Sequence, residues 1–346
     1  MKAAAVSTKL REEHEEVLVH TGQHFDDDLS AVFFDELGLP APERQLGIAL
    51  GSNTSQTARM LAALEPLLEE VSPDMILVYG DTNSTLAGAL AGAQAGLPVA
   101  HVESGMRSFD RSMPEELNRV VADQVSTLLL CSSRAAVENL RREHVAGAIE
   151  LVGDVMVDVA QTIQPEARGR TELVTARGVS PREYVFCTSH RAGNVDDPVR
   201  LRRLVELLLA VPSPLILALH PRTRARLVDT GLLERLEQAE RVVLTPPLGY
   251  IEAMALLCNA RAALTDSGGL QKEAYLAGVP CVTMRHTTEW VETVEYGWNT
   301  LVDLDAAAAL EALEREPPAQ RPQLYGDGRA GERVVAALEE FQLSRA

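Results

Sequence analysis

Short apolar runs rich in β-branched residues alternate with amphipathic, helix-forming stretches along most of this 346-residue chain. Such alternation predicts parallel α/β sheets, because parallel strands need a crossover, usually a helix, between them. In the first half, the runs that we expect to be strands are 17–20, 75–79, 99–102, 128–131 and 149–152. In the second half they are 184–188, 215–219, 242–244, 262–265 and 279–284.

Length and composition along the chain predict two domains. A chain of this length exceeds the usual size of one hydrophobic core, and a polar stretch around 164–171 interrupts the alternation. We expect an N-terminal Rossmann-like domain at 1–165, completed by a C-terminal helix at 329–346, and a second Rossmann-like domain at 166–328. Two such parallel sheets would face a central cleft, where their strands end.

The first ten residues depart from this pattern, because they already have the periodicity of an amphipathic helix. Many folds begin with a helix. A doubly wound domain ordinarily begins with a strand, however, and the run at 17–20 needs a parallel neighbour. We therefore expect the first strand of the first domain to be missing.

The charge and the cysteines restrict the partners and the compartment. A formal net charge of -18 argues against a nucleic-acid surface, which would require clustered Lys and Arg. The four cysteines lie far apart without zinc-binding spacing, which is typical of buried thiols in a reducing compartment and predicts no metal. No apolar run reaches the roughly 20 residues of a membrane span, and no signal-peptide pattern opens the chain. We expect a cytoplasmic protein with neither nucleic acid nor membrane as partner.

The segment TDSGGLQKEA at 265–274 lies between two predicted strands and has the features of a phosphate-binding turn. Gly268 and Gly269 allow close approach of an anion to the backbone, the following helix presents free N–H groups, and Ser267 adds a hydroxyl. Glu273 lies one helical turn later and could accept hydrogen bonds from a ribose diol. A serine-capped connection without a ligand is the alternative.

Other predicted strands end in acidic or histidine-bearing loops, where ligands of parallel sheets bind. In the first half these loops contribute Asp81, Glu103 with Arg107, and Glu115. Asp81 and Glu115 also fit ordinary helix starts, but together the loops bring acids to one sheet edge. In the second half, two strands end in His190 with Arg191 and in His220, and a histidine there could transfer a proton or bind a phosphate.

These motifs together resemble the non-hydrolysing UDP-N-acetylglucosamine 2-epimerases over residues 2 to about 331. The matching strings, in the family's order, are HTGQHFD, YGDTNSTLAGAL, HVESGMRS, MPEELNR, TSHRAGN, HPRTR, TDSGGLQKEA and YGDG. The resemblance implies two Rossmann-like domains of the glycosyltransferase-B type, a homodimer, no NAD or metal cofactor, and a role in supplying polysaccharide precursors.

The resemblance also assigns residues. Its catalytic positions are Asp81, Glu103, Glu115 and His190. Its substrate-binding positions are Lys2, Arg107, Arg191, His220, Tyr250, Ser267, Gly268, Gly269 and Glu273. Gln23, His24 and Arg59 resemble the region where substrate activates some members of the family. The family eliminates UDP to give a glycal and adds it back after reprotonation of C2 on the other face, which requires an acid, a base and a held leaving group.

Two departures from the family's pattern leave alternatives open. Lys2 matches the trailing lysine of the family's GTRPE-like loop, whose arginine has no counterpart here, so an inactive relative is one alternative. Trp290, in HTTEWVE, stands where the N-acetylglucosamine enzymes tend to have arginine, and it resembles the relatives that act on UDP-2,3-diacetamido-2,3-dideoxyglucuronate. A glycosyltransferase on the same fold, or a hydrolysing epimerase, could share the glycine turn.

Overall fold

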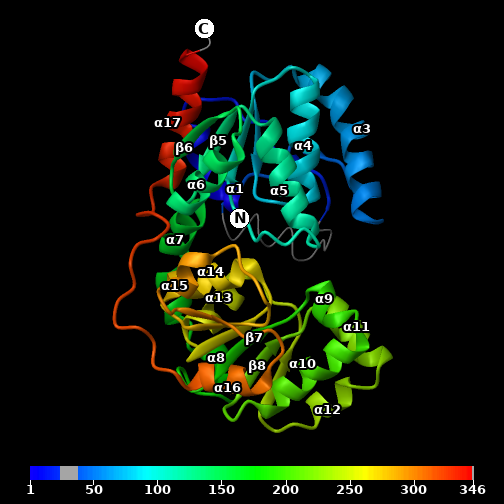
Figure 1. Cartoon of the computed structure of the whole chain (residues 1–346), viewed down its shortest axis with the longest axis vertical. Helices are drawn as coiled ribbons and strands as arrows, with labels where there is room; N and C mark the ends of the chain where they lie inside the picture. Colours follow the sequence, from blue (N-terminus) through cyan, green and yellow to red (C-terminus); the bar gives the residue numbers. More distant parts are fainter. Residues whose placement is uncertain (24–37, 345–346) are drawn as a thin grey trace. The chain divides into compact units, whose positions relative to one another are not determined.

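The computed structural model describes residues 1–23 and 38–344. The chain divides into two compact units, one formed by Met1–Val159 with Gln323–Ala346 (unit 1) and the other by Ala160–Pro322 (unit 2). Both limits lie a few residues before those expected from the sequence. Each unit contains a parallel sheet with helices around it, which confirms the predicted α/β class (Figure 1). In the described ranges, no helix has the length and apolar character needed to cross a membrane.

Unit 1 contains a four-stranded parallel sheet in the order β3-β4-β5-β6 and a separate parallel pair, β1-β2. The strands are β1 (Val19–His20), β2 (Arg44–Gln45), β3 (Ile76–Tyr79), β4 (Val99–Ser104), β5 (Leu128–Cys131) and β6 (Ala148–Leu151). The helices are α1 (Lys2–Leu10), α3 (Asn53–Val71), α4 (Asn83–Gln94), α5 (Pro114–Val125), α6 (Arg134–Glu143), α7 (Val155–Gly169, which crosses into unit 2) and α17 (Ala330–Leu343). The short, polar β2 is absent from the strands expected from the sequence.

Apolar side chains of β4 point alternately to the two faces of this sheet, and helices cover both. Ala100 and Val102 belong to a core that includes residues of α1 and α17. Val99 belongs to a core on the opposite face with Ala89 of α4 and Ala122 of α5. Because β4 is buried on both sides, its run lacks the polar alternation of a half-exposed strand.

The C-terminal helix α17 lies against α1, at the other end of the chain. A Cβ atom on Gly331 would lie 2.2 Å from the Ala5 carbonyl oxygen, so only glycine allows this close approach. Asp158 of α7 accepts hydrogen bonds from the backbone N–H groups of Ala330 (3.1 Å) and Gly331 (2.8 Å). These contacts fix α17 against α1 and α7 of unit 1.

Unit 2 contains a six-stranded parallel sheet in the order β12-β11-β10-β7-β8-β9. Its strands are β7 (Val185–Thr188), β8 (Leu215–Ala218), β9 (Val242–Thr245), β10 (Ala262–Thr265), β11 (Cys281–Thr283) and β12 (Asn299–Leu301), of which only β12 is absent from the expected runs. Its helices are α8 (Glu172–Thr175), α9 (Ala192–Val195), α10 (Pro198–Ala210), α11 (Pro221–Asp229), α12 (Leu233–Glu237), α13 (Tyr250–Cys258), α14 (Gly268–Ala277), α15 (Val291–Glu295) and α16 (Ala306–Glu314).

The strand order of unit 2 reverses between β7 and β10. The chain proceeds outward from β7 through β8 to β9 and then returns to β10, which pairs with β7 on its other side. The loops that follow β7 and β10 therefore diverge at a topological switch point, where open parallel sheets bind their ligands. The loop after β7 contains His190, and the loop after β10 contains Ser267.

Candidate active site

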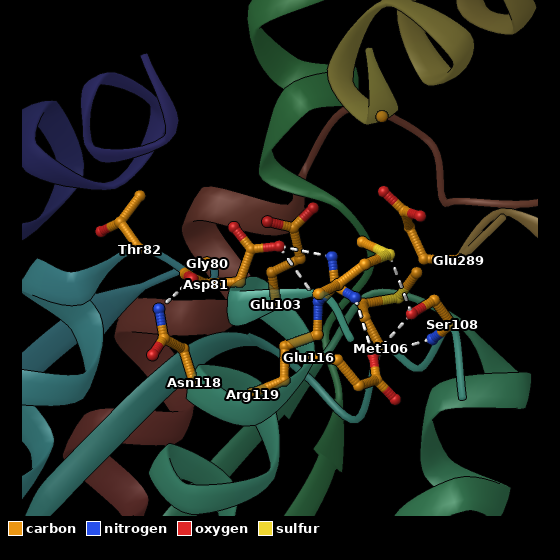
Figure 2. A network of polar contacts seen from close by, with 12 residues as sticks. Gly80, Asp81, Thr82, Glu103, Met106, Ser108, Glu116, Asn118, Arg119 and Glu289 are labelled. Carbon is orange, nitrogen blue, oxygen red and sulfur yellow. Dashed lines mark hydrogen bonds and ion pairs between the residues drawn. The ribbon is translucent and has the colours of Figure 1, made fainter. Parts of the chain in front are cut away.

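Asp81 lies in the turn between β3 and α4 of unit 1 and is held by α5. Its carboxylate accepts hydrogen bonds from the Arg119 side chain, from Nε at 3.0 Å and from Nη2 at 2.5 Å. Asn118 Nδ2 donates to the Asp81 carbonyl oxygen at 2.9 Å (Figure 2). Thr82, rather than Asp81, is the N-cap of α4, and it forms a capping box with Thr85. The Asp81 carboxylate is therefore positioned by a two-pronged guanidinium contact and is not used to cap the helix.

Glu103 lies near the end of β4 in a conformation that is unusual for a residue with a side chain. Its φ is 69°, and the pairing of β4 with β5 shifts register between Val102 and Ser104. The carboxylate is 8% exposed and forms an ion pair with Lys2 Nζ. A left-handed glutamate at a strand end costs about 1–3 kcal/mol and is found where the surroundings impose it, often at functional sites.

Gly80 makes room for the ion pair between Lys2 and Glu103. Its φ is +68°, and a Cβ atom there would lie 2.5 Å from Lys2 Nζ and 3.4 Å from Glu103 Oε2. The Gly80 N–H donates to the Val102 carbonyl at 3.0 Å, which keeps this turn beside the end of β4. The structure thus brings Lys2, Asp81 and Glu103 to the same edge of the unit 1 sheet.

The adjacent acids of the PEELNR motif have different surroundings. Glu116 is buried, and its carboxylate accepts hydrogen bonds from the N–H groups of Ser108 and Phe109 and from Arg119 Nη1, each at 2.9 Å (Figure 2). Glu115, in the first turn of α5, is partly exposed and has no hydrogen-bond or ion-pair partner among the described residues. Glu116 therefore holds the preceding loop, and Glu115 has a carboxylate available for a ligand.

Arg107 does not have the surroundings expected of a substrate-binding residue. Its guanidinium is buried and contacts Asp123 Oδ2 at 2.7 Å, both carboxylate oxygens of Glu143 at 2.8 and 2.6 Å, and the Met106 carbonyl at 2.8 Å. These neighbours hold the pKa of Arg107 above its usual value, although burial alone would lower it. The Arg107 guanidinium is thus occupied by contacts within unit 1, and its assignment to substrate binding stays a prediction.

The residues resembling a regulatory region are only partly described. Gln23 Oε1 accepts hydrogen bonds from Ser84 N at 2.9 Å and Ser84 Oγ at 3.0 Å, at the start of α4. Arg59 is an exposed residue of α3, and its Nε donates to the Ser55 carbonyl at 3.3 Å. His24 lies outside the described residues. Gln23 therefore contacts the helix that follows Asp81, whereas Arg59 contacts its own helix.

In unit 2, the buried Asp266 organises the switch point. Its carboxylate accepts hydrogen bonds from Ser189 Oγ (2.7 Å), His190 N (3.0 Å), Arg191 N (3.3 Å) and Asn194 Nδ2 (3.0 Å). One carboxylate at the end of β10 thus shapes the loop after β7. This loop leaves the His190 side chain 41% exposed.

His190 and His220 lie side by side, with ring centroids 5.3 Å apart. The His220 ring Nδ1 accepts a hydrogen bond from Arg222 N at 3.1 Å and caps α11, so its proton lies on Nε2. Arg191 Nε donates to the Asp266 carbonyl at 2.9 Å. Both histidines and Arg191 are partly or fully exposed at the carboxyl edge of the sheet, where an anion can reach them.

The glycine turn leads directly into α14. Ser267 is its N-cap, with the hydroxyl 3.4 Å from Leu270 N. A Cβ atom on Gly268 would lie 2.1 Å from Glu289 Oε1, and Trp290 Nε1 donates to the Gly268 carbonyl at 2.8 Å. The Ser267 cap uses the N–H group of Leu270, and the other N-terminal N–H groups of α14 can bind a ligand. The segment can therefore be both a serine-capped connection and a phosphate-binding turn.

Glu273 lies one turn further along α14. Burial raises the pKa of its carboxyl to about 7, although Lys272 and the Tyr250 hydroxyl act in the opposite direction. Lys272 is also buried, with its ammonium 4.3 Å from the centroid of the Trp290 ring. Glu273 and Tyr250 are thus neighbours in the structure, and their assignment to substrate binding stays a prediction.

Several organising residues were not among the sequence candidates. Asn118 and Arg119 belong to the PEELNR motif, and Asp266 belongs to TDSGG, so the motifs already contained them. Their task is visible only when the fold brings distant segments together: Arg119 lies 38 residues from Asp81, and Asp266 lies 76 residues from His190.

The chain matches the UDP-N-acetylglucosamine 2-epimerase family over residues 8–339. It is 42% identical over 344 residues to a UDP-N-acetylglucosamine 2-epimerase homolog of Methanococcus maripaludis, covering 99% of this chain and 96% of the relative. It is 44% identical over 353 residues to the UDP-2,3-diacetamido-2,3-dideoxy-D-glucuronate 2-epimerase of Pseudomonas aeruginosa, with the same coverage.

The structure resembles the crystal structure of Methanocaldococcus jannaschii UDP-GlcNAc 2-epimerase in complex with UDP-GlcNAc and UDP. The TM-score is 0.92 at 36% sequence identity, and the match covers 98% of this chain and 96% of the other. The match over nearly the whole chain, together with the two relatives, shows that the chain belongs to the UDP-N-acetylglucosamine 2-epimerase family.

Proposed function

We propose that this protein inverts C2 of a UDP-linked hexosamine and interconverts UDP-N-acetylglucosamine and UDP-N-acetylmannosamine. The observation that carries the proposal is the presence of two complementary sets of residues in one chain. Unit 1 presents Asp81, Glu103 and Glu115 at the carboxyl edge of its sheet, and unit 2 presents a glycine turn with Glu273. The similarity to an epimerase crystallised with UDP-GlcNAc and UDP supports the same reaction.

The reaction explains why the site needs several acids. The C2 proton of the sugar is not adjacent to a carbonyl, so its direct removal would leave an unstabilised carbanion. If a base takes this proton while the C1–O bond breaks, the electrons of the C2–H bond form a C1–C2 double bond. UDP then leaves with the electrons of the C1–O bond. Protonation of C2 on the opposite face and return of the UDP oxygen to C1 complete the inversion without net oxidation.

The surroundings of the acids suit proton transfer on two faces of a sugar. Lys2 and Arg119 form ion pairs with the carboxylates of Glu103 and Asp81, respectively. Glu115 has no such partner among the described residues and can gain or lose a proton without breaking an ion pair. Carboxyl groups in different environments can divide the acid and base roles.

The residues of unit 2 suit the leaving group. The N-terminus of α14, capped by Ser267, offers N–H groups and a positive dipole end to a diphosphate. His190 and Arg191 can neutralise charge that develops on the departing UDP. Glu273, once ionised, can accept hydrogen bonds from both ribose hydroxyls.

Deuterium exchange tests the proposed reaction. Incubation with UDP-N-acetylglucosamine in deuterated water should place deuterium at C2 and produce the manno epimer, without free N-acetylmannosamine. Formation of a glycoside only after addition of an acceptor would instead indicate a glycosyltransferase, and release of the free sugar would indicate a hydrolysing epimerase. Absence of C2 exchange with any UDP-hexosamine would refute the proposal.

A second substrate, UDP-2,3-diacetamido-2,3-dideoxyglucuronate, is favoured by one structural observation. Trp290, which departs from the pattern of the N-acetylglucosamine enzymes, is hydrogen-bonded to Gly268 of the glycine turn and covered by the Lys272 ammonium. The Pseudomonas aeruginosa relative named for this substrate is 44% identical to the chain. The ratio of kcat/KM for the two UDP-sugars, measured in parallel, assigns the substrate.

We further propose a cytoplasmic homodimer that supplies precursors for polysaccharide synthesis. All four cysteines are buried free thiols, which suits a reducing compartment. Analytical ultracentrifugation should give about twice the 37.5 kDa chain mass. A monomer at micromolar concentration would refute the dimer.

A further inference from the structure

A buried cluster of charged residues lies directly behind Glu103. Asp123 of α5 and His101 of β4 are 0% exposed, and Arg107 is 2% exposed. His101 Nδ1 lies 2.7 Å from Asp123 Oδ1, and Arg107 Nη1 lies 2.7 Å from Asp123 Oδ2. Removing one partner of a buried carboxylate is strongly destabilising, so each of these contacts matters to the cluster.

Asp123 contacts the chain on both sides of Glu103. One of its oxygens meets the ring of His101, two residues before Glu103, and the other accepts the Gly105 N–H, two residues after it, at 3.1 Å. Between these two contacts the register shifts and Glu103 adopts its φ of 69°. This conformation persists only where the surroundings impose it, and the Asp123 carboxylate contacts the backbone or side chain on both flanks of Glu103.

The His101 ring extends the same cluster to the other acid. Its Nε2 lies 2.7 Å from the carbonyl oxygen of Gly80, the residue before Asp81. Both ring nitrogens therefore face acceptors, a carboxylate and a carbonyl. For the ring to donate both bonds, each nitrogen has to carry a proton, which is the imidazolium form.

The charges around His101 balance when it is protonated. Asp123 is paired with His101 and Arg107, and the remaining side of the Arg107 guanidinium is paired with Glu143. Burial alone would raise the pKa of the Asp123 carboxyl, but the His101 and Arg107 charges hold it below its usual value. With His101 protonated, the two cations and two anions balance, and of the four side chains only Glu143 is partly exposed.

We propose that Asp123 and the His101 imidazolium are positioning residues that set Glu103 in its left-handed conformation and fix the turn carrying Asp81. Neither residue is exposed to a substrate, so both act through the acids. The inference rests on the proposed function, because it assigns a task that matters only if Glu103 and Asp81 take part in the reaction. Its structural part, a charged His101, holds independently of any activity.

The test uses an Asp123→Asn variant of the full chain. In asparagine, an NH₂ group replaces one carboxylate oxygen and would face a donor from Gly105, Arg107 or His101. The variant also lacks the negative charge that stabilises a second proton on His101. We expect kcat for C2 exchange to fall by about 100-fold, the size typical of a misplaced catalytic group, while the Kd for UDP changes less than about threefold. Nitrogen-15 spectra of histidine-labelled protein at pH 8 should show a doubly protonated ring in the wild type and a singly protonated one in the variant, with His101→Gln identifying the signal.

Asp158→Asn is the matched control. Asp158 is a partly buried unit 1 carboxylate that, like Asp123, accepts backbone N–H groups, but it holds α17 rather than the acids. We expect it to lower stability less than Asp123→Asn does while leaving kcat unchanged. The inference is wrong if Asp123→Asn retains wild-type kcat, if the control loses kcat equally, or if wild-type His101 is neutral at pH 8. If the variant fails to fold, the wild-type spectrum still tests whether His101 is charged. A wild type that shows no C2 exchange would refute the proposed function and leave the charge of His101 untouched.

Discussion

Replacement of Glu273 by glutamine should separate the stability of unit 2 from its affinity for UDP. In the ligand-free protein, burial raises the pKa of this carboxyl from an ordinary value of 4.5 to about 7. Between these two values the folded state binds more protons than the unfolded state, so stability falls as the pH rises and levels off above about 7. At about 1.4 kcal/mol per pKa unit, ionised Glu273 costs the folded protein about 3 kcal/mol at pH 9.

The Glu273→Gln variant lacks this cost, because its side chain is neutral at every pH. Its stability relative to the wild type should therefore grow by about 3 kcal/mol between pH 4 and pH 9. At the same time, the loss of a charged acceptor for the ribose hydroxyls should weaken UDP binding by roughly 10- to 100-fold, corresponding to about 1.5–3 kcal/mol.

Tryptophan fluorescence during urea titration provides the assay. The two tryptophans of the chain, Trp290 and Trp298, both lie in unit 2, so the signal reports the unit that contains Glu273. Isothermal calorimetry measures UDP binding. Glu237→Gln, at an exposed position of the same unit, is the control and should show no pH-dependent difference. A stability difference that is constant with pH, or an unchanged Kd for UDP, would refute the reasoning.

Four further substitutions test unit 1. Glu115→Gln should lower kcat by about 10²- to 10⁴-fold with an unchanged melting temperature, whereas Glu116→Gln should destabilise the fold by about 1–3 kcal/mol; exchange rates and calorimetry distinguish them. Gly80→Ala should displace the Lys2 amine and cost about 1 kcal/mol of backbone strain. Expressed as free energies, the loss of kcat should exceed the loss of unfolding free energy. Gly331→Ala should destabilise unit 1 by about 1–3 kcal/mol while tryptophan fluorescence is unchanged, and an unaltered circular-dichroism melt would contradict it.

Much of the fold and of the candidate site follows from local patterns. The apolar runs predicted most strands because strands buried in a parallel sheet are short and continuously hydrophobic. They missed β2 and β12, which have two and three residues and depend on their neighbours for their conformation. Motif order was sufficient to name Glu103, Glu115 and Glu273 as candidates, because ligands of such sheets lie at strand ends.

The sequence by itself determined the α/β class, the family and the loops that carry the chemistry, because periodicity and motifs are local properties of a chain. Only the tertiary structure distinguished Glu115 from Glu116 and showed that Arg107 is a buried partner of Asp123. It also showed that the Asp123 carboxylate contacts residues on both flanks of Glu103. The physical reason is that burial and hydrogen-bond partners depend on segments far apart in the chain. A side chain's charge and availability are decided by what folding brings against it.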